Sequence, residues 1–495
     1  MEAKMKIRNM IYCCLISMVI LSGCTKTENK FEGLNTPGAK ESAIQYNSFF
    51  LPEKDGNVQP YVGDTMPYYE DGTYYIYYLK DGGDSYNHSV YLATTSDFLS
   101  YKEFPEPVLE ASRNGGQDSW IGTGSLVKFN NKYLFFYTGH ADSSVSGYKE
   151  KIMIAEGDTP FSFTKKEGWY ITPPSELNQK NDFRDPQAYY DEKDNKIILT
   201  VTASKNNAAR ILKYSLTPDL TEINYEGIIF TDPSYKFWNL ECSDTFKIGN
   251  KYYLTYSAQD DTLWYAVSDT AYGPYSNAKR LEGKLFYAAK HVDDGENYYM
   301  VGWLRRSESP SSTQEVSAWA GNLAVQKIIQ KENGELLLAP VVKIVQQFTQ
   351  KQKLLGKKNI TLGAGALYSY QPMFDCYESF CLTGKFKFSA DGSFGLSFDY
   401  NGRQNKNKMI SISPSENKIQ LLFNEGSTLI SETEVQLQKD REYSFTYIQE
   451  GSAGIFYIDG EAALCVRLYG VCGNKISLFA ENNTVVFSSL EERTK

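Results

Sequence analysis

The sequence predicts an all-β protein, a five-bladed β-propeller followed by a C-terminal antiparallel β-sandwich. The first observation is a turn dipeptide followed at once by an aromatic or β-branched strand, a pattern that occurs five times. The five turns start at Asp71, Asn130, Asp194, Gly249 and Asp294. The second is a series of short alternating runs near the C-terminus. The third is the abundance of aromatic residues that favour strands, with 38 Tyr and 27 Phe among 495 residues.

The N-terminus has the pattern of an export signal. Three basic residues precede the apolar run "IYCCLISMVI", which is too short for a comfortable membrane span, so residues 1–23 are predicted to be a signal peptide. The run ends in "LSGC", which resembles a bacterial lipobox and implies cleavage before Cys24 and lipidation of its thiol. An uncleaved signal anchor is the alternative. Residues 24–45 are polar and are interpreted as a tether that holds the protein outside the cytoplasm, anchored by lipid to a bacterial membrane.

The five repeats are predicted to be blades of a propeller that spans residues 46–345. Asp-Gly and Asn-rich turns followed by such strands are strong hairpin signals. Hairpins at fairly regular spacing, with no convincing long helical pattern between them, are typical of propeller blades. A β-sandwich or a β-helix is the competing architecture.

Three acidic residues share one phase of the repeat. Asp64, Asp185 and Glu241 lie seven, nine and eight residues before their turns. The segments "IGTGS" and "YAAKH" occupy the same places in the second and fifth repeats. Because the innermost strands of a propeller surround its axis, the three carboxylates are expected to converge at one end of that axis.

Converging carboxylates are the usual requirement for hydrolysis of a glycosidic bond. One must be ionised to attack or to activate water, and another must be protonated to assist the leaving oxygen. Crowding and burial push their pKa values apart, which assigns the roles. Arg184, beside Asp185, is expected to hold that aspartate ionised and oriented. A surface pair at the start of a strand is the alternative for these two residues.

The motifs around these residues resemble those of glycoside hydrolase family 32, the β-fructosidases. "FRDPQAYY" and "WNLECSDTFKIGNKYYLTYS" are similar to its Arg-Asp-Pro and Glu-Cys motifs, and "GDTMPYYEDGTYYIYY" resembles the segment that bears its nucleophilic aspartate. The resemblance implies that Asp64 is the nucleophile, that Glu241 is the general acid and then the base, and that Asp185 stabilises the transition state. It also implies retention of configuration through a covalent fructosyl-enzyme.

The segment around Asp64 departs from the family pattern. Val62 and Gly63 precede the aspartate, where the family usually has Trp and Asn, and Thr65 and Met66 follow it, where the family has Pro-Asn-Gly. "ECSD" replaces the commoner Glu-Cys-Pro. These differences indicate a divergent branch.

Further residues near the acidic motifs are candidates for binding sugar, with inner-strand or core packing as the alternative. These substrate-binding candidates are Arg184, Trp120, Thr123, Gly124, Ser125, Phe183 and Trp238. Tyr287 and Trp303 are expected to be structural.

Composition excludes several classes of function. The net charge of −9 and the absence of a basic patch make nucleic acid an unexpected partner. Three histidines and no paired C-x-x-C motif predict neither a metal site nor a cofactor. The pairs Cys465–Cys472 and Cys376–Cys381 remain candidates for disulfides. The oligomeric state stays open.

The C-terminal part is predicted to be a separate β-sandwich. Residues 346–363 are polar and rich in lysine, and they are interpreted as a linker. Short alternating runs over residues 364–495 then indicate the sandwich, which either binds carbohydrate or simply covers the catalytic domain.

The predicted function is a retaining glycoside hydrolase that releases fructose from β-fructosides of the sucrose, inulin or levan type. Its expected partner is therefore a fructose-containing oligo- or polysaccharide. One alternative is a lipid-anchored sugar-binding protein that has lost catalysis, which the retained set of Asp64, Asp185 and Glu241 disfavours. The other is a related five-bladed hydrolase of the arabinofuranosidase type.

Overall fold

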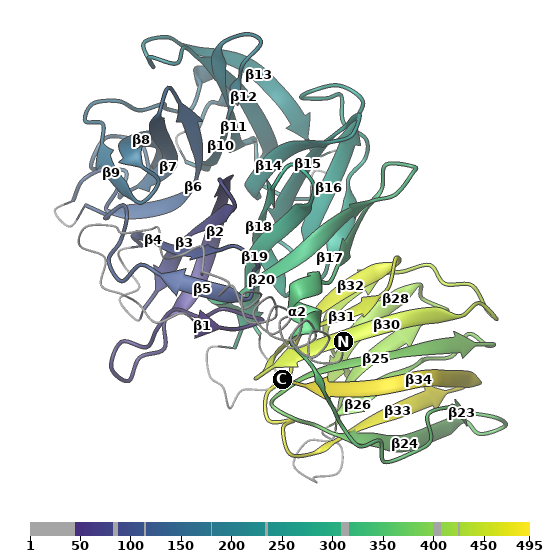
Figure 1. Cartoon of the computed structure of the whole chain (residues 1–495). Helices are drawn as coiled ribbons and strands as arrows, with labels where there is room; N and C mark the ends of the chain where they lie inside the picture. Colours follow the sequence, from purple (N-terminus) through teal and green to yellow (C-terminus); the bar gives the residue numbers. More distant parts are fainter. Residues whose placement is uncertain are drawn as a thin grey trace, which may run out of the picture. The chain divides into compact units, whose positions relative to one another are not determined.

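The regular secondary structure of the described part of the chain is almost all β-strand (Figure 1). The computed structural model describes residues 45–82, 88–112, 115–179, 181–232, 236–307, 316–398, 407–423 and 426–495. All of them belong to one unit of the chain, Ala43–Lys495. The predicted signal peptide, Cys24 and all but the last residue of the predicted tether lie outside the described residues. The prediction of an all-β protein is confirmed.

Helical structure is limited in these residues to two short segments. They are the 3-10 helix η2 (Ser175–Leu177) and the helix α2 (Val342–Gln346). No helix in the described ranges is long and apolar enough to cross a membrane.

Five groups of four antiparallel strands make up the first part of the chain, and in each group the strands pair in sequence order. The first two groups are β2 (Tyr61–Glu70), β3 (Thr73–Asp81), β4 (Val90–Thr95) and β5 (Ser100–Glu103), then β6 (Trp120–Phe129), β7 (Lys132–His140), β8 (Glu150–Thr159) and β9 (Ser162–Lys165). The next two are β10 (Phe183–Asp191), β11 (Lys196–Lys205), β12 (Ala208–Leu216) and β13 (Ile223–Thr231), then β14 (Leu240–Ile248), β15 (Lys251–Ala258), β16 (Leu263–Ser268) and β17 (Lys279–Glu282). The fifth group is β18 (Phe286–Asp293), β19 (Tyr298–Arg306), β20 (Ala318–Gln330) and β21 (Leu336–Ala339).

The five predicted hairpins are confirmed, since each predicted turn joins the first two strands of a group. Three of the turns begin with a residue in the left-handed region, Asp71 at φ 48°, Asn130 at φ 47° and Gly249 at φ 58°. Asn, Asp and Gly tolerate this conformation better than other residues, which is why the turns could be recognised in the sequence.

The first strands of the five groups follow one another in a closed ring of contacts (Figure 1). β2 contacts β6, and the contacts continue through β10, β14 and β18 back to β2. The first and fifth groups are also joined by one pairing, between Val62 of β2 and Gly321 of β20. Apolar side chains from neighbouring groups fill the space between the sheets. A sheet that is covered on both faces needs apolar residues on both, which explains the nearly continuous apolar runs in the second strands.

The C-terminal part consists of two antiparallel sheets. One contains β22 (Gln350–Lys351), β34 (Val485–Thr494), β25 (Ser379–Phe388), β30 (Tyr443–Glu450), β31 (Ala453–Ile458) and β32 (Ala462–Arg467), with β23 (Ile360–Leu362) also on β34. The other contains β24 (Tyr368–Asp375), β33 (Lys475–Glu481), β26 (Phe394–Phe398), β27 (Lys408–Ser413), β28 (Lys418–Phe423) and β29 (Thr428–Glu434). The rings of Phe386 and Phe388 lie 5.1 and 5.3 Å from that of Phe394 in the facing sheet. The two sheets therefore form a sandwich around an aromatic core.

The segment interpreted as a linker, residues 346–363, carries β22 and β23, and both pair with β34. This segment is thus built into the edge of the sandwich. Arg467 of β32 reaches back to the fifth group, where its guanidinium donates to the carbonyls of Leu304 at 2.7 Å and Arg305 at 3.0 Å. The five cysteines in the described residues are all free.

Candidate active site

A β-bulge interrupts the first strand of every group at the same place. The pairing with the second strand shifts between Val62 and Thr65, Gly122 and Gly124, Arg184 and Gln187, Glu241 and Asp244, and Tyr287 and Lys290. In the last three bulges, one residue takes a positive φ, namely Asp185 at 58°, Cys242 at 51° and Ala288 at 49°. Bulges bend a strand and re-aim its side chains, so this repeated feature explains how residues at one phase of the repeat reach a common site.

The three predicted carboxylates are brought together through shared neighbours. Thr123 donates its hydroxyl to Asp64 at 2.9 Å, and the same hydroxyl lies 3.4 Å from the sulfur of Cys242. The backbone N–H of Cys242 donates to the Asp185 carboxylate at 2.6 Å, and Glu241 precedes Cys242 in the chain. The charge of Glu241 raises the pKa values of both aspartates, after the larger effect of burial. The arrangement is therefore one electrostatically connected cluster.

Asp64 is held by two side-chain donors. Besides the Thr123 hydroxyl, the indole N–H of Trp303 donates to its other carboxylate oxygen at 3.1 Å. Burial raises the pKa of Asp64, and the two hydrogen bonds act in the opposite direction because they stabilise the ionised form. The carboxylate is therefore fixed in position on both oxygens.

The pKa of Asp185 is subject to opposing influences. Burial raises the pKa of this carboxyl to about 7, against the opposing influence of Arg184. No hydrogen bond joins the two side chains in the described residues; the Arg184 guanidinium instead contacts Glu150 and Glu241, each at 3.0 Å. The bulge and the positive φ of Asp185 re-aim the side chains at this point of β10, which leaves the guanidinium on the two glutamates. The charge of Arg184 therefore favours the ionised form of Asp185, as expected, but burial outweighs it, and Arg184 does not orient Asp185 through a hydrogen bond.

Glu241 receives one donor on each oxygen. Arg184 donates to Oε1 at 3.0 Å, and the hydroxyl of Tyr287 donates to Oε2 at 2.5 Å. Glu150, on β8, is the second carboxylate that forms an ion pair with Arg184. Burial disfavours the Glu150 carboxylate, but His140 and Arg184 more than offset it, and its pKa falls to about 2. The ion pair with Glu150 holds the Arg184 guanidinium in place, and Arg184 in turn positions the Glu241 carboxyl.

Two aromatic residues that were expected to be structural belong to the site. Tyr287 binds Glu241 and Trp303 binds Asp64, and the two residues pair with each other across β18 and β19. The position of Tyr287 could have been predicted from the repeat, because Tyr287 occupies the bulge position in the fifth group that Glu241 occupies in the fourth. The assignment of a purely structural role to these residues is therefore corrected.

The substrate-binding candidates on β6, the first strand of the second group, differ in whether they contact a carboxylate. Thr123 touches Asp64, as described above. Gly124 and Ser125 instead join strands: a Cβ on Gly124 would lie 2.1 Å from the Phe136 carbonyl, and the Ser125 hydroxyl accepts the N–H of Ala188 at 2.8 Å. These two residues serve packing, not contact with the carboxylates.

The aromatic candidates for binding sugar differ in their exposure to solvent. Phe183 is completely buried in the core between the second and third groups, so the prediction that it contacts sugar is wrong. Trp120 and Trp238 are 40% and 42% exposed. Trp120 stacks on His140 with ring centroids 4.9 Å apart, and the Arg184 guanidinium lies 5.4 Å from the ring of Trp238. Trp238 therefore retains a free surface beside Arg184, and Trp120 retains one beside His140, which pairs with Glu150.

The glycine before Asp64 has a packing role that the sequence did not reveal. A Cβ on Gly63 would lie 2.2 Å from the ring of Trp319, and Trp319 in turn stacks on His88 at 4.4 Å. Within the described ranges, no group of three His, Cys, Asp or Glu side chains is arranged to bind a metal ion.

Comparison with known proteins identifies a family for the chain. Residues 64–340, more than half of the chain, match the family model described as the glycosyl hydrolases family 32 N-terminal domain. Sucrose-6-phosphate hydrolase of Escherichia coli is 24% identical over 270 residues, which are 50% of this chain and 55% of that protein. Raffinose invertase of Escherichia coli is 22% identical over 296 residues, which are 55% of this chain and 60% of that protein. The chain thus spans little more than half the length of these two relatives.

A solved structure extends the likeness to nearly the whole fold. The exo-inulinase of Aspergillus awamori superposes with a TM-score of 0.71 at 15% identity, over 92% of this chain and 99% of that one. At this identity the superposition supports the fold. The match to the family model is what carries the assignment: the chain belongs to glycosyl hydrolases family 32.

Proposed function

We propose that the protein is a retaining β-fructosidase that releases fructose from sucrose, inulin or levan by double displacement. The observation that carries the proposal is the cluster of Asp64, Asp185 and Glu241, which three different bulged strands bring together with separate hydrogen-bond partners. Hydrolysis of a fructoside with retention needs a nucleophilic carboxylate and an acid/base carboxyl on opposite sides of the bond. The named relatives, a sucrose-6-phosphate hydrolase, an invertase and an exo-inulinase, support a fructose-containing substrate.

In the proposed first step, Asp64 attacks the anomeric carbon of a terminal fructose. The hydrogen bonds from Thr123 and Trp303 orient the carboxylate and favour its ionised form. Glu241 gives its proton to the departing oxygen as the bond breaks. The products are the shortened sugar and a fructose ester of Asp64.

In the second step, Glu241 takes a proton from water, which attacks the same carbon and releases fructose and the Asp64 carboxylate. Arg184 and Tyr287 hold both oxygens of Glu241, so the group stays in one place as its role changes. Asp185 binds sugar hydroxyls and stabilises the positive charge that develops on the ring. With a pKa of about 7, it is ionised readily once that charge appears beside it.

The wider organisation follows from the same proposal. The five four-stranded groups would be the blades of a five-bladed propeller over residues 46–345, with the sandwich over residues 364–495 packed on its side. Residues 1–23 would be removed as a signal peptide, and a lipid on Cys24 would anchor the enzyme outside the cytoplasm of a bacterial cell.

One assay tests the proposal. The purified protein, Asp64→Asn and Glu241→Gln are incubated with sucrose, inulin, levan and aryl arabinofuranosides. We expect fructose release from at least one fructoside by the intact protein and from none by either variant. Sugar binding without release by the intact protein would leave a non-catalytic binder as the better account, and cleavage of the arabinofuranosides alone would indicate the related hydrolase.

A further inference from the structure

A pocket lies further along the first strands than the carboxylates, towards the hairpin turns. It has a volume of about 790 Å³, within the usual size range for a small-molecule site. Residues from all five first strands contribute to its walls, among them Tyr68 of β2, Gln187 of β10, Thr245 of β14 and His291 of β18. Each lies two to four residues beyond the catalytic candidate or bulge residue of its own strand, nearer to the hairpin turn. We name this cavity the turn-end pocket.

The turn-end pocket is separated from the carboxylates by a buried side chain. Lys290 extends from β18 across the interior of the ring, and its amine donates to the carbonyl of Gly124 on β6 and to the side-chain oxygen of Gln187 on β10, each at 2.9 Å. β6 and β10 are not neighbours of β18 in the ring, so Lys290 crosses the axis. A ligand in the turn-end pocket therefore does not enter the catalytic cluster.

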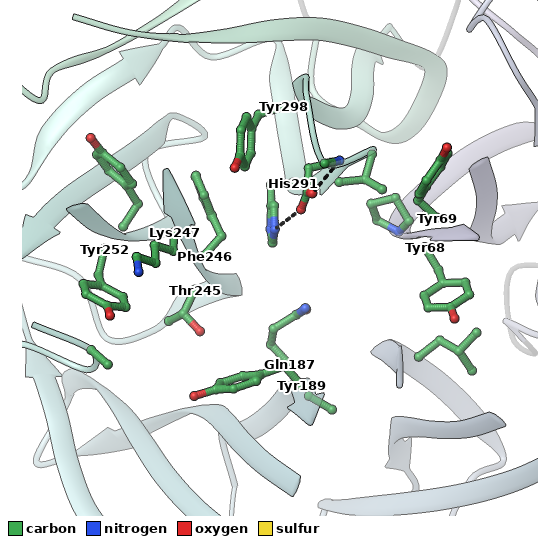
Figure 2. A pocket seen from close by; sticks show the side chains of 18 of the residues that line it. Tyr68, Tyr69, Gln187, Tyr189, Thr245, Phe246, Lys247, Tyr252, His291 and Tyr298 are labelled. Carbon is green, nitrogen blue, oxygen red and sulfur yellow. Dashed lines mark hydrogen bonds and ion pairs between the residues drawn. The ribbon is translucent and has the colours of Figure 1, made fainter. Parts of the chain in front are cut away.

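Tyrosine rings form much of the wall of the turn-end pocket (Figure 2). Tyr68 lies on one side, Tyr252 lies on the opposite side, and Tyr298 lies near His291 on β18 and β19. All three rings are partly exposed. A Tyr side chain offers an apolar face and a polar tip, which suits a ligand with both kinds of surface.

Polar groups stand between these rings. The amide of Gln187 and the imidazole of His291 point into the space between Tyr68 and Tyr252 (Figure 2). His291 is held on one side by Asp244, with Nδ1 to Oδ2 at 2.5 Å, and faces Asp293 on the other, with Nε2 to Oδ2 at 3.8 Å. The positions of these groups are fixed before any ligand arrives.

Aromatic rings beside polar side chains fit a carbohydrate ligand best. A sugar ring has an apolar face of C–H groups, which packs on an aromatic ring, and an edge of hydroxyls, which pairs with amide, imidazole and carboxylate groups. The charges in the pocket are of both signs, with Lys247 near Tyr252 and Asp293 near His291, so a strongly charged ligand gains little. We propose that the turn-end pocket binds a neutral oligosaccharide and holds a second stretch of glycan on the enzyme, apart from the site of cleavage.

Affinity electrophoresis tests this proposal without turnover. The full chain with Asp64→Asn, which suppresses hydrolysis, is run in native gels that contain inulin, levan or dextran. Tyr252→Ala removes one wall of the turn-end pocket, and Thr245→Tyr fills the cavity without removing a ring. Tyr377→Ala is the matched control, because this tyrosine is 36% exposed on the sandwich and lies outside the pocket.

We expect at least one polysaccharide to retard the parent protein. Both pocket variants should weaken that binding by about two- to tenfold, the range that one aromatic packing contact supplies, while the control should bind as the parent does. Absence of retardation in all three gels, or equal retardation of the parent and both pocket variants, would overturn the proposal. Because binding is read without catalysis, this result stands apart from whether the enzyme releases fructose.

Discussion

Removing the hydroxyl of Thr123 tests the role of Asp64 without touching a carboxylate. Thr123→Val keeps the shape of a fully buried side chain but deletes the donor 2.9 Å from the Asp64 oxygen. Thr123→Ser is the matched control, since it loses only a methyl group and keeps the hydroxyl. The two variants together separate the hydrogen bond from the packing.

The expected loss can be worked from that single contact. A hydrogen bond to a charged group contributes about 1.5–3 kcal/mol, which corresponds to about a 10- to 150-fold fall in kcat/KM for Thr123→Val. The bond stabilises the ionised form and so lowers the pKa of Asp64; its loss moves that pKa upward. Because attack needs the carboxylate, activity should then disappear at a higher pH as the solution is acidified.

The assay is the pH profile of kcat/KM on the best fructoside substrate, with thermal melting as a check of folding. Thr123→Ser should keep the acid limb of the wild-type profile and lose little rate. If Thr123→Val melts normally and matches the wild type in rate and acid limb, then Asp64 does not act as the ionised nucleophile and the reasoning is refuted.

Three further changes have defined outcomes. Gly63→Ala places a Cβ against the ring of Trp319, so it should cost about 1–3 kcal/mol of stability and lower both Tm and fructose release, measured by melting and by the standard assay. Arg184→Lys cannot hold Glu150 and Glu241 at once as the two guanidinium nitrogens do, so kcat should fall by about tenfold or more in a variant that still melts cooperatively; an unchanged kcat would contradict the positioning role. Burial raises the pKa of Glu492 to about 8, and neither of its carboxyl oxygens has a hydrogen-bond partner among the described residues. The folded protein therefore keeps a proton that the unfolded chain releases, and stability falls as pH rises from about 5 to 8. Glu492→Gln should therefore raise Tm at about pH 8 more than at pH 5, and an equal effect at both values would contradict this.

The strands and hairpins were predictable because their signals are local. Each hairpin combines turn residues that accept positive φ with a following aromatic or β-branched run. The convergence of Asp64, Asp185 and Glu241 could be predicted by counting residues back from each turn. Residues at a similar distance from the turn lie at a similar level on the first strands. Closure of the ring depends on contacts between distant strands, so the sequence indicated it only through the number and regularity of the repeats.

The partners of the carboxylates were harder to predict. Arg184 adjoins Asp185 in sequence, but its partner Glu150 lies on β8, and the order of residues along the chain does not reveal this contact. Trp303 reaches Asp64 from the second strand of the fifth group, a position that the repeat phase does not mark. Phe183 stands beside the motif but points into the core, since neighbouring residues on a strand face opposite ways.

The most direct test of the account is chemical identification of the nucleophile. The Glu241→Gln variant is mixed with β-fructosyl fluoride, whose fluoride departs without a proton from Glu241, and the mixture is quenched in acid, digested and analysed by mass spectrometry. The account predicts one added fructosyl group on the peptide that contains Asp64, and none when Asp64→Asn is combined with this variant. A fructosyl group on another peptide, or turnover with inversion of configuration, would contradict it.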